Sequence, residues 1–348
     1  MLEGVLHCSN PECRREYPII DGIPLIIANL RQYVADNLPA IQARRDLSDV
    51  VESILGDCCG SNSAYDRIRQ HLSSYVWDHY GELDPAEAVT EPRPGSILRT
   101  LQGGLELVGQ SKSAARRRDA RHKTPASPAE AQPAPTPAID VGCAVGRTTF
   151  ELAMRAPGLV LGVDLHFPML RLAAEVLRYG TIRYPRRRVG LVYERREFPV
   201  SFPHTDNLDF WACDATALPL PAQTFGFALG LNVLDCVSSP RDLLCSLAHT
   251  LQPGARIVLT CPYDWSLSAT PAEAWLGGHS QRSPLAGACE AVLRALLTPG
   301  AHPASINSLK LISEREHLPW QVRLHDRSTM TYQLHLVVAE RVAVPRVA

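Results

Sequence analysis

The strongest constraint on the fold of this chain is a series of five short apolar runs between residues 138 and 260. Helix-like segments separate several of these runs, beginning near Thr148, at Met169 and at Pro240. Strands that alternate with helices at this spacing indicate an α/β fold with a parallel, doubly wound sheet. The apolar runs occupy residues 138–141, 159–163, 208–212, 225–231 and 256–260.

The segments before this core predict two further modules. Residues 31–108 carry apolar side chains at helical spacing, notably along 47–55 and 65–80, and we expect a helical cap there. Residues 109–137 are rich in proline, alanine and arginine and have little to bury. That composition is typical of a disordered linker.

Two segments around the core have different patterns. The charged segment 183–205 interrupts the alternation, and we interpret it as an irregular insertion near the ligand site. The tail contains two apolar runs, 320–324 and 332–339, whose spacing predicts a terminal antiparallel hairpin.

Composition narrows the functional classes. The length of 348 residues suits two modules or one enlarged α/β domain. Lys+Arg 35 against Asp+Glu 36 leaves a net charge of -1, which makes a generally basic nucleic-acid binder unlikely. We find no signal-peptide pattern and no apolar run long enough for a membrane span, so we expect a soluble cytoplasmic protein whose ten cysteines are reduced. The oligomeric state is left open.

Small and polar residues stand where the predicted strands end. The first strand leads into a tight loop of small residues, Gly142 to Gly146, through which a ligand can approach the backbone and a helix N-terminus. Asp164 ends the second strand, where a carboxylate can accept hydrogen bonds from both ribose hydroxyls of a nucleoside. Asp214 follows the third strand and can accept from an adenine amino group, while Asn232 follows the fourth. These residues predict a nucleoside-type ligand in a cleft at the carboxyl edge of the sheet.

These pieces together resemble class I S-adenosylmethionine-dependent methyltransferases. The similarity lies in the sequences IDVGCAVGRTTFELA, LGVDLHFPML, WACDATALPLPAQTFGFALGLNVLD and LQPGARIVLTCPYDW, within 138–265. It implies a methyltransferase domain over 138–344 with a Rossmann-like sheet and S-adenosylmethionine as cofactor. One departure is Ala144, where the family usually has glycine. The residues assigned to the cofactor are Asp140, Gly142, Cys143, Ala144, Gly146, Asp164, Leu165, Asp214, Ala215 and Asn232.

A narrower resemblance concerns the methyl acceptor. The sequences CPYDWSLSATPAEAWLGG, DVGCAVGRTTFELA and SSYVWDHYG are similar to the methyltransferase domain of ovothiol-biosynthesis enzymes. This similarity implies a small-molecule acceptor, an imidazole nitrogen of a thiohistidine. Candidate substrate-binding residues are Tyr75, Tyr80 and Trp275, with core packing as the alternative role. Candidate catalytic bases are Asp235, Tyr263 and His79.

The first 30 residues resemble, in part, a small zinc-ribbon family found fused to methyltransferases or partnering them. The match consists of Cys8 and Cys13 in a C-x4-C pattern, followed by YPI-x-DGIPLII with a hairpin turn at Asp21-Gly22. A structural zinc site needs four ligands, and the first cysteine pair is absent, so we expect no metal here.

Two other functions stay open, and two more are disfavoured. A cleft lined by Cys143, Cys213, Cys236 and Cys261 would also suit methyl transfer to the sulfur of a small thiol or sulfide. The alternative role of these cysteines is packing, as small buried residues that fill tight space. A non-catalytic activator or scaffold would keep the glycine loop, bind the cofactor and have no methyl acceptor. A nicotinamide-dependent oxidoreductase would need Gly-x-Gly-x-x-Gly, which the loop does not contain. Methylation of nucleic-acid amino groups is disfavoured because the fourth strand ends in GLNVLDCV.

Overall fold

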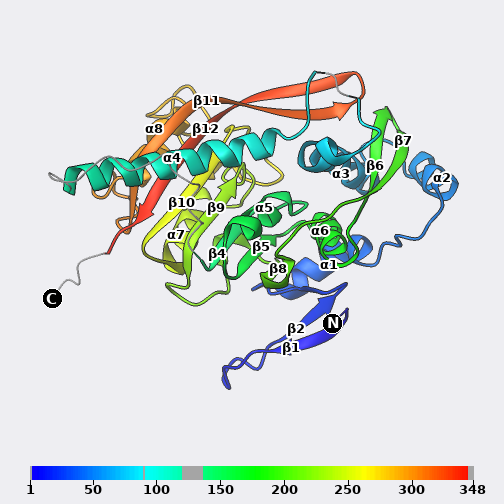
Figure 1. Cartoon of the computed structure of the whole chain (residues 1–348), viewed down its shortest axis with the longest axis horizontal. Coiled ribbons are helices and arrows are strands. Elements are labelled where there is room, and N and C mark those ends of the chain that lie inside the picture. Colours follow the sequence, from blue (N-terminus) through cyan, green and yellow to red (C-terminus); the bar gives the residue numbers. More distant parts are fainter. Residues whose placement is uncertain (1, 89–90, 120–135, 344–348) are drawn as a thin grey trace.

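A seven-stranded sheet forms the centre of the computed structural model, which describes residues 2–88, 91–119 and 136–343. The strand order is β11-β12-β10-β9-β4-β5-β8 (Figure 1). The five strands from β10 to β8 run parallel, and the terminal hairpin β11–β12 is antiparallel, as predicted. The strands are β4 (Ala138–Val141), β5 (Val160–Asp164), β8 (Leu208–Ala212), β9 (Phe225–Leu231), β10 (Leu251–Cys261), β11 (Leu309–His325) and β12 (Ser328–Arg341).

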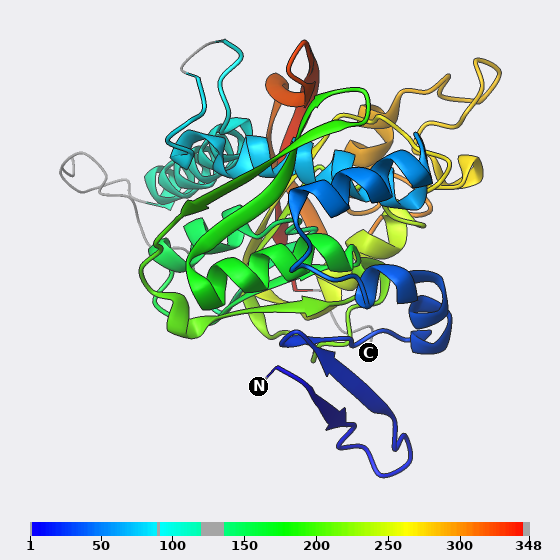
Figure 2. The same cartoon turned by 90° about the vertical axis from the view of Figure 1, so that its right-hand side faces the viewer.

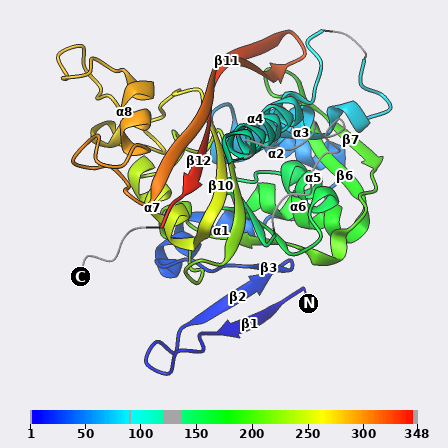
Figure 3. The same ribbon diagram turned by 60° about the vertical axis from the view of Figure 1, so that its left-hand side comes forward.

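Helices cover both faces of this sheet (Figure 3). One face packs against α4 (Ser96–Asp119), α5 (Arg147–Arg155) and α6 (Phe167–Tyr179), with Phe150 and Leu170 in its core. The other face packs against α7 (Pro240–Thr250) and α8 (Cys289–Leu296), with Leu244 and Leu293 in its core. Burying each such side chain stabilises the fold by about 1.5–3 kcal/mol, so both cores hold the strand ends in fixed positions.

Helix α3 (Ala64–Tyr80) lies between two hairpins. The hairpin β6 (Thr181–Val189) and β7 (Val192–Pro199) contacts it on one side, where the Arg187 amide donates to Ser73 Oγ at 2.8 Å. The long hairpin β11–β12 contacts it on the other, where Trp320 Nε1 donates to Asp78 Oδ2 at 2.7 Å. The tips of the two hairpins meet, because the Asp326 amide donates to the Arg188 carbonyl at 3.2 Å (Figure 1). Helix α3 is therefore fixed from both sides.

The segment 183–205 corrects one expectation, since most of it forms the hairpin β6–β7 rather than an irregular insertion. Alternate positions are buried, with Ile182 and Tyr184 facing the core. The charged side chain between them faces a partner across the hairpin, in the pair Arg183–Glu197 at 3.8 Å. Paired arginine and glutamate side chains on the two strands stand where a half-buried strand usually has alternating apolar residues. The strands were therefore not recognised from the sequence.

The remaining N-terminal helices also depart from the expected boundaries. The predicted linker from 109 begins as helix, because α4 continues to Asp119, and residues 120–135 lie outside the described residues. Helix α1 covers Leu30–Ile41 and α2 covers Asp49–Cys59. The apolar positions predicted to mark α2 are exposed, Val50 by 69%. Short 3-10 helices occupy Gly81–Leu83, Thr205–Asn207, Ala215–Ala217 and Ala272–Ala274.

Residues 1–30 contain the predicted hairpin and dock on the main sheet. The strands are β1 (Gly4–His7), β2 (Glu16–Ile20) and β3 (Ile23–Pro24), and the turn residues Asp21 and Gly22 both have positive φ, 52° and 77°. Just beyond β3, the Ile26 amide donates to the Ala212 carbonyl of β8 at 2.9 Å. Arg171 of α6 pairs with Asp21 at 2.7 Å. Figure 2 shows β1 and β2, in blue, extending away from the rest of the chain.

The described helices were also compared with the length and apolarity that a membrane span requires, and none of them meets both conditions.

Candidate functional site

The loop after β4 has an unusual backbone. Gly142, Ala144 and Gly146 all have positive φ, at 74°, 50° and 84°. A Cβ on Gly142 would lie 2.8 Å from Val233, and one on Gly146 would lie 2.7 Å from both Ala173 and Phe210. Both glycines are therefore required by packing as well as by conformation. The loop turns sharply and opens α5 with its N-terminal amides at the carboxyl edge of the sheet.

Two buried carboxylates hold this loop. Asp140 accepts hydrogen bonds from the hydroxyls of Thr148 at 2.6 Å and Thr149 at 2.8 Å, and burial raises its pKa to about 6. Asp164 accepts from the amides of Ala144 at 2.9 Å and His166 at 2.8 Å. Burial raises the pKa of Asp164 also. Asp140 thus orients the start of α5, whereas Asp164 ties the loop to the end of β5 and retains free lone pairs.

The other residues predicted for the cofactor lie at successive strand ends. Asp214 caps a short helix by accepting from the Thr216 amide at 2.9 Å. Ala215 and Cys143 are buried, whereas Leu165 is 41% exposed. Asn232 has a φ of 54°, and its Oδ1 accepts from the Thr260 hydroxyl at 2.7 Å. Its Nδ2 is buried and has no hydrogen-bond partner among the described residues.

Sequence analysis missed one residue at this edge. Tyr33 of α1 donates its hydroxyl to the Leu165 carbonyl at 2.7 Å. Burial and the nearby Asp164 and Cys213 raise the pKa of Tyr33. Helix α1 therefore covers the ends of β5 and β8. No sequence signal near Tyr33 distinguished it from other aromatic residues of the helical segment.

A cluster of acidic and hydroxyl groups lies under α3, at the ends of β9 and β10. Asp235 is buried, and its Oδ2 accepts from the Asp264 amide at 2.8 Å. The exposed Cys236 donates to Asp235 Oδ1 at 3.7 Å, and desolvation together with Asp235, Asp164 and Asp264 raises the pKa of this thiol to about 12. Burial and the nearby Cys236, Asp164 and Asp235 also raise the pKa of Tyr75. We call this cluster of Tyr75, Asp164, Asp235, Cys236 and Asp264 the acidic edge.

Two predicted residues of α3 lie elsewhere. Tyr80 is 0% exposed, and its hydroxyl donates to the Val145 carbonyl of the glycine loop at 2.7 Å. His79 is also buried, its Nδ1 has no hydrogen-bond partner among the described residues, and burial lowers its pKa to about 3. Both side chains belong to the packing between α3 and the loop in this structure, because neither has exposed surface to offer an acceptor.

A cavity of about 570 Å³ lies beside the end of β10. Tyr263, Trp265 and Trp275 form an aromatic wall, in which the two tryptophan rings stack with centroids 6.1 Å apart. Tyr263 has a φ of 56°, which is strained for an aromatic residue. Its hydroxyl lies 2.7 Å from His335 Nδ1. We call this space the aromatic cavity.

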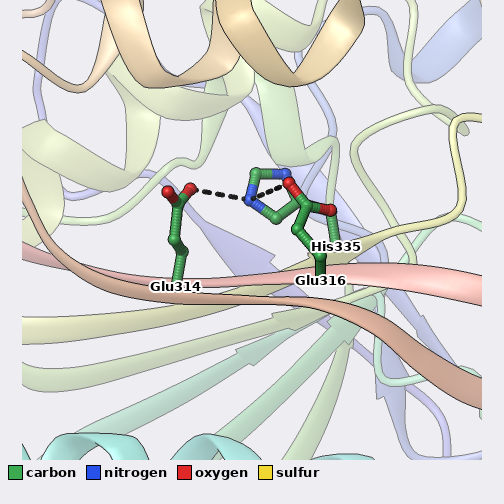
Figure 4. A group of neighbouring side chains, drawn as sticks. All are labelled: Glu314, Glu316 and His335. Carbon is green, nitrogen blue, oxygen red and sulfur yellow. Dashed lines mark hydrogen bonds and ion pairs between the residues drawn. The ribbon is translucent and has the colours of Figure 1, made fainter.

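His335 lines the aromatic cavity and also contacts two glutamates, Glu314 and Glu316 (Figure 4). Its Nε2 lies 3.0 Å from Glu314 Oε2 and 3.6 Å from Glu316 Oε1. The three side chains could hold a metal ion by their spacing. However, Arg294 already pairs with both carboxylates, at 2.8 Å to Glu314. A cation would have to displace this guanidinium, so we assign the group to an ion-pair network.

A second cavity, of about 390 Å³, lies between α1, α3, α6 and β6. Arginines such as Arg45 and Arg183 line it, but these pair with Glu175 at 2.9 Å and Glu197 at 3.8 Å. In the N-terminal unit, the described residues place no third metal-binding side chain with Cys8 and Cys13. None of the cysteines forms a disulfide within the described chain.

One known domain family matches the middle of the chain. Residues 139–259 match the family model of a methyltransferase domain. No curated protein sequence matches the chain. Among solved structures, a SAM-dependent methyltransferase of Methanosarcina mazei is similar at 19% identity, over 60% of this chain and 92% of that one, with a TM-score of 0.38.

Two further solved structures are similar over a smaller share of both chains. A SAM-dependent methyltransferase of Aquifex aeolicus matches at 17% identity, over 59% of this chain and 81% of that one, with a TM-score of 0.32. Phosphoethanolamine N-methyltransferase 2 of Haemonchus contortus, solved with S-adenosyl-L-methionine, matches at 17% identity with a TM-score of 0.29. This match covers 37% of this chain and 25% of that one.

The matched segment contains the glycine loop and β4, β5, β8 and β9, and it ends within β10. The sheet has the predicted doubly wound, Rossmann-like arrangement. The chain therefore contains a methyltransferase domain over residues 139–259, and this domain supports activity as an S-adenosylmethionine-dependent methyltransferase.

Proposed function

We propose that this enzyme transfers the methyl group to an imidazole nitrogen of a small, thiohistidine-like acceptor. S-adenosylmethionine supplies the methyl group on a sulfonium sulfur. The glycine loop would lie along the cofactor, Asp164 would accept from its ribose hydroxyls, and Asp214 from its adenine. The unpartnered Nδ2 of Asn232 would donate to its polar end. The protein's main contribution is to align the two reactants and exclude water.

The charges of the acidic edge favour nitrogen over sulfur as the atom that accepts the methyl group. Its carboxylates, together with desolvation, raise the pKa of Cys236 to about 12. The same field acts on any thiol brought to this edge and disfavours the thiolate that sulfur methylation requires. A neutral imidazole needs no prior loss of a proton, and the positive charge that it gains is stabilised by Asp235 and Asp164. An acidic surrounding therefore favours a nitrogen acceptor.

Methyl transfer to the sulfur of a small thiol or sulfide is the second candidate. The exposed thiol of Cys236 supports this candidate, because it adds a polarisable sulfur to the surface of the acidic edge. A cofactor-binding activator without an acceptor is the third candidate. It fits less well because the aromatic cavity offers space for a planar molecule beside the acidic edge.

The experiment is an acceptor panel with methyl-labelled S-adenosylmethionine, read by mass spectrometry with fragmentation to locate the label. The panel holds thiohistidines, histidine, simple thiols and sulfide. Label on a ring nitrogen supports the proposal. Label on sulfur moves the enzyme to the second candidate, and cofactor binding without any product moves it to the third. Asp235→Asn should lower nitrogen methylation and leave the urea midpoint close to that of the unaltered enzyme.

A further inference from the structure

The aromatic cavity adjoins the acidic edge at a single turn of the chain. Tyr263 lines the aromatic cavity, while the next residue, Asp264, donates its amide to Asp235 at the acidic edge. The backbone of Tyr263 is held at a φ of 56°. Strain of this kind persists only where the surrounding structure fixes it, and it is frequent where a side chain must be aimed at a reacting group.

Behind Tyr263 lies an ordered series of hydrogen bonds. The Tyr263 hydroxyl is 2.7 Å from His335 Nδ1, and His335 Nε2 is 3.0 Å from Glu314 Oε2. His335 is only 2% exposed, so its ring is fixed between these two partners. Glu314 and Glu316 are two residues apart in β11, so both face the same side of the strand, toward this ring. Sequence analysis identified Tyr263 but neither His335 nor Glu314.

The charges decide the direction of these hydrogen bonds. Although partial burial opposes it, hydrogen bonds from Arg294 and His335 lower the pKa of Glu314, so this carboxylate is ionised at neutral pH. An ionised carboxylate can only accept, so the proton of a neutral His335 must sit on Nε2. His335 Nδ1 is then an acceptor, and the Tyr263 hydroxyl donates to it.

We propose that the aromatic cavity holds the methyl acceptor and that Tyr263 receives the proton released by methyl transfer, while His335 and Glu314 position it and carry its own proton away. This inference rests on the proposed function. Tyr263 is the catalytic residue, and His335 and Glu314 act through it. The stacked rings of Trp265 and Trp275 would pack against a planar heterocycle.

Methyl transfer to a neutral ring nitrogen leaves one proton to be removed. The acceptor's unprotonated ring nitrogen forms a bond to the methyl carbon, the carbon–sulfur bond breaks, and its electron pair stays on sulfur. The methylated ring is then a cation with one N–H. That proton passes to the Tyr263 oxygen as the phenolic proton passes to His335 Nδ1. His335 becomes a cation beside the Glu314 carboxylate and later releases the proton to solvent. Burial and nearby Cys261 raise the pKa of Tyr263, so the two transfers must occur together.

The first test measures the direction of the hydrogen bonds without turnover. Histidine ring nitrogens are observed by NMR in 15N-labelled enzyme, and the His335 signals are assigned by their loss in His335→Gln. A neutral ring protonated on Nε2 is expected. A ring protonated on Nδ1 would overturn the inference, because such a ring cannot receive the proton of Tyr263.

The second test uses Tyr263→Phe and His335→Gln, with Tyr179→Phe and His249→Gln as matched controls on exposed positions. Loss of a catalytic proton acceptor typically lowers the rate by about 10²–10⁴-fold, and we expect Tyr263→Phe to lower kcat by about 100-fold or more. Affinity for S-adenosylmethionine should stay within twofold. The controls should retain the unaltered rate.

The pH profile separates a proton-carrying role from a structural one. His335→Gln should lower kcat and change the shape of the kcat profile with pH, whereas loss of a merely structural residue should leave that shape unchanged. The charged or titratable groups facing the pair are Glu314, Glu316, Arg294, Cys261, Cys289 and Glu290.

The outcomes separate the two proposals. If the unaltered enzyme methylates imidazole nitrogen and Tyr263→Phe does so within twofold of it, the inference fails and the proposed function stands. If the unaltered enzyme methylates no imidazole, the proposed function fails and takes the catalytic inference with it.

Discussion

Two substitutions in the glycine loop should change stability in opposite directions. Gly146→Ala places a side chain at a φ of 84°, which costs about 1–2 kcal/mol, and forces its Cβ to within 2.7 Å of Ala173 and Phe210. Overpacking of this kind adds about 1–3 kcal/mol. We therefore expect Gly146→Ala to lower the free energy of unfolding by about 2–5 kcal/mol in total.

Ala144→Gly should have the reverse effect. The substitution removes the conformational strain of an alanine at a φ of 50°, which stabilises the folded state by about 1–2 kcal/mol. Glycine also raises the conformational entropy of the unfolded chain, which lowers the free energy of unfolding by about 0.5–1 kcal/mol. The net result is a free energy of unfolding that is unchanged or raised by about 1 kcal/mol. Gly254→Ala is the matched control, because Gly254 has the same φ of 84° with no atom near its Cβ position.

The assay is urea unfolding followed by tryptophan fluorescence and circular dichroism, with the slope of the transition compared between variants. The difference between Gly146→Ala and Gly254→Ala isolates the steric contribution from the conformational one. Equal losses in these two variants would refute the packing argument. A clear loss of stability in Ala144→Gly would refute the argument from backbone conformation.

Three further outcomes are expected. Asp164→Ala should lower affinity for S-adenosylmethionine at least 100-fold by calorimetry while circular dichroism shows the fold retained; unchanged affinity would contradict the cofactor assignment. Burial lowers the pKa of His166 to about 4, so the folded state favours the neutral ring and loses stability as pH falls from about 6.5 through 4. Between pH 7.5 and 5 the free energy of unfolding should fall by about 1–2 kcal/mol more in the unaltered enzyme than in His166→Gln. Equal falls in the two proteins, measured by urea unfolding, would contradict this role of His166. Arg171→Met removes the partner of Asp21 and of the Ala40 carbonyl, so it should destabilise the chain by about 1–3 kcal/mol and speed proteolysis within residues 1–45; an unchanged digestion pattern would show that this contact is dispensable.

The parallel sheet could be predicted from sequence because its strands are buried on both faces. Strands such as β5 and β9 therefore appear as continuous apolar runs, and β5 ends at the polar residue Asp164. The hairpin β6–β7 could not be predicted in the same way. Its positions that face partners across the strands carry arginine and glutamate, so charge pairing replaces the apolar pattern there.

The site was predictable only in part for a similar reason. Asp164, Asn232 and Tyr263 follow strands, so sequence order alone places them at one edge. His335 and Glu314 lie in the middle of long strands. Their place behind Tyr263 depends on the pairing of β12 with β10 and with β11. Tyr80 shows the opposite limit, because its spacing in α3 does not reveal that its hydroxyl bonds to the glycine loop.

The hydrogen bond from Ile26 to Ala212 has a consequence for the solubility of the enzyme. Strand β8 is the last in the sheet, and an uncovered last strand offers unpaired amides and carbonyls to other chains. The backbone around Leu25 and Ile26 covers part of that strand, and Leu25 is fully buried against it. A chain shortened to begin at residue 31 would lose this cover and leave an apolar strand open to intermolecular pairing. The N-terminal unit would then serve as a guard against aggregation, whatever else it contributes to the enzyme.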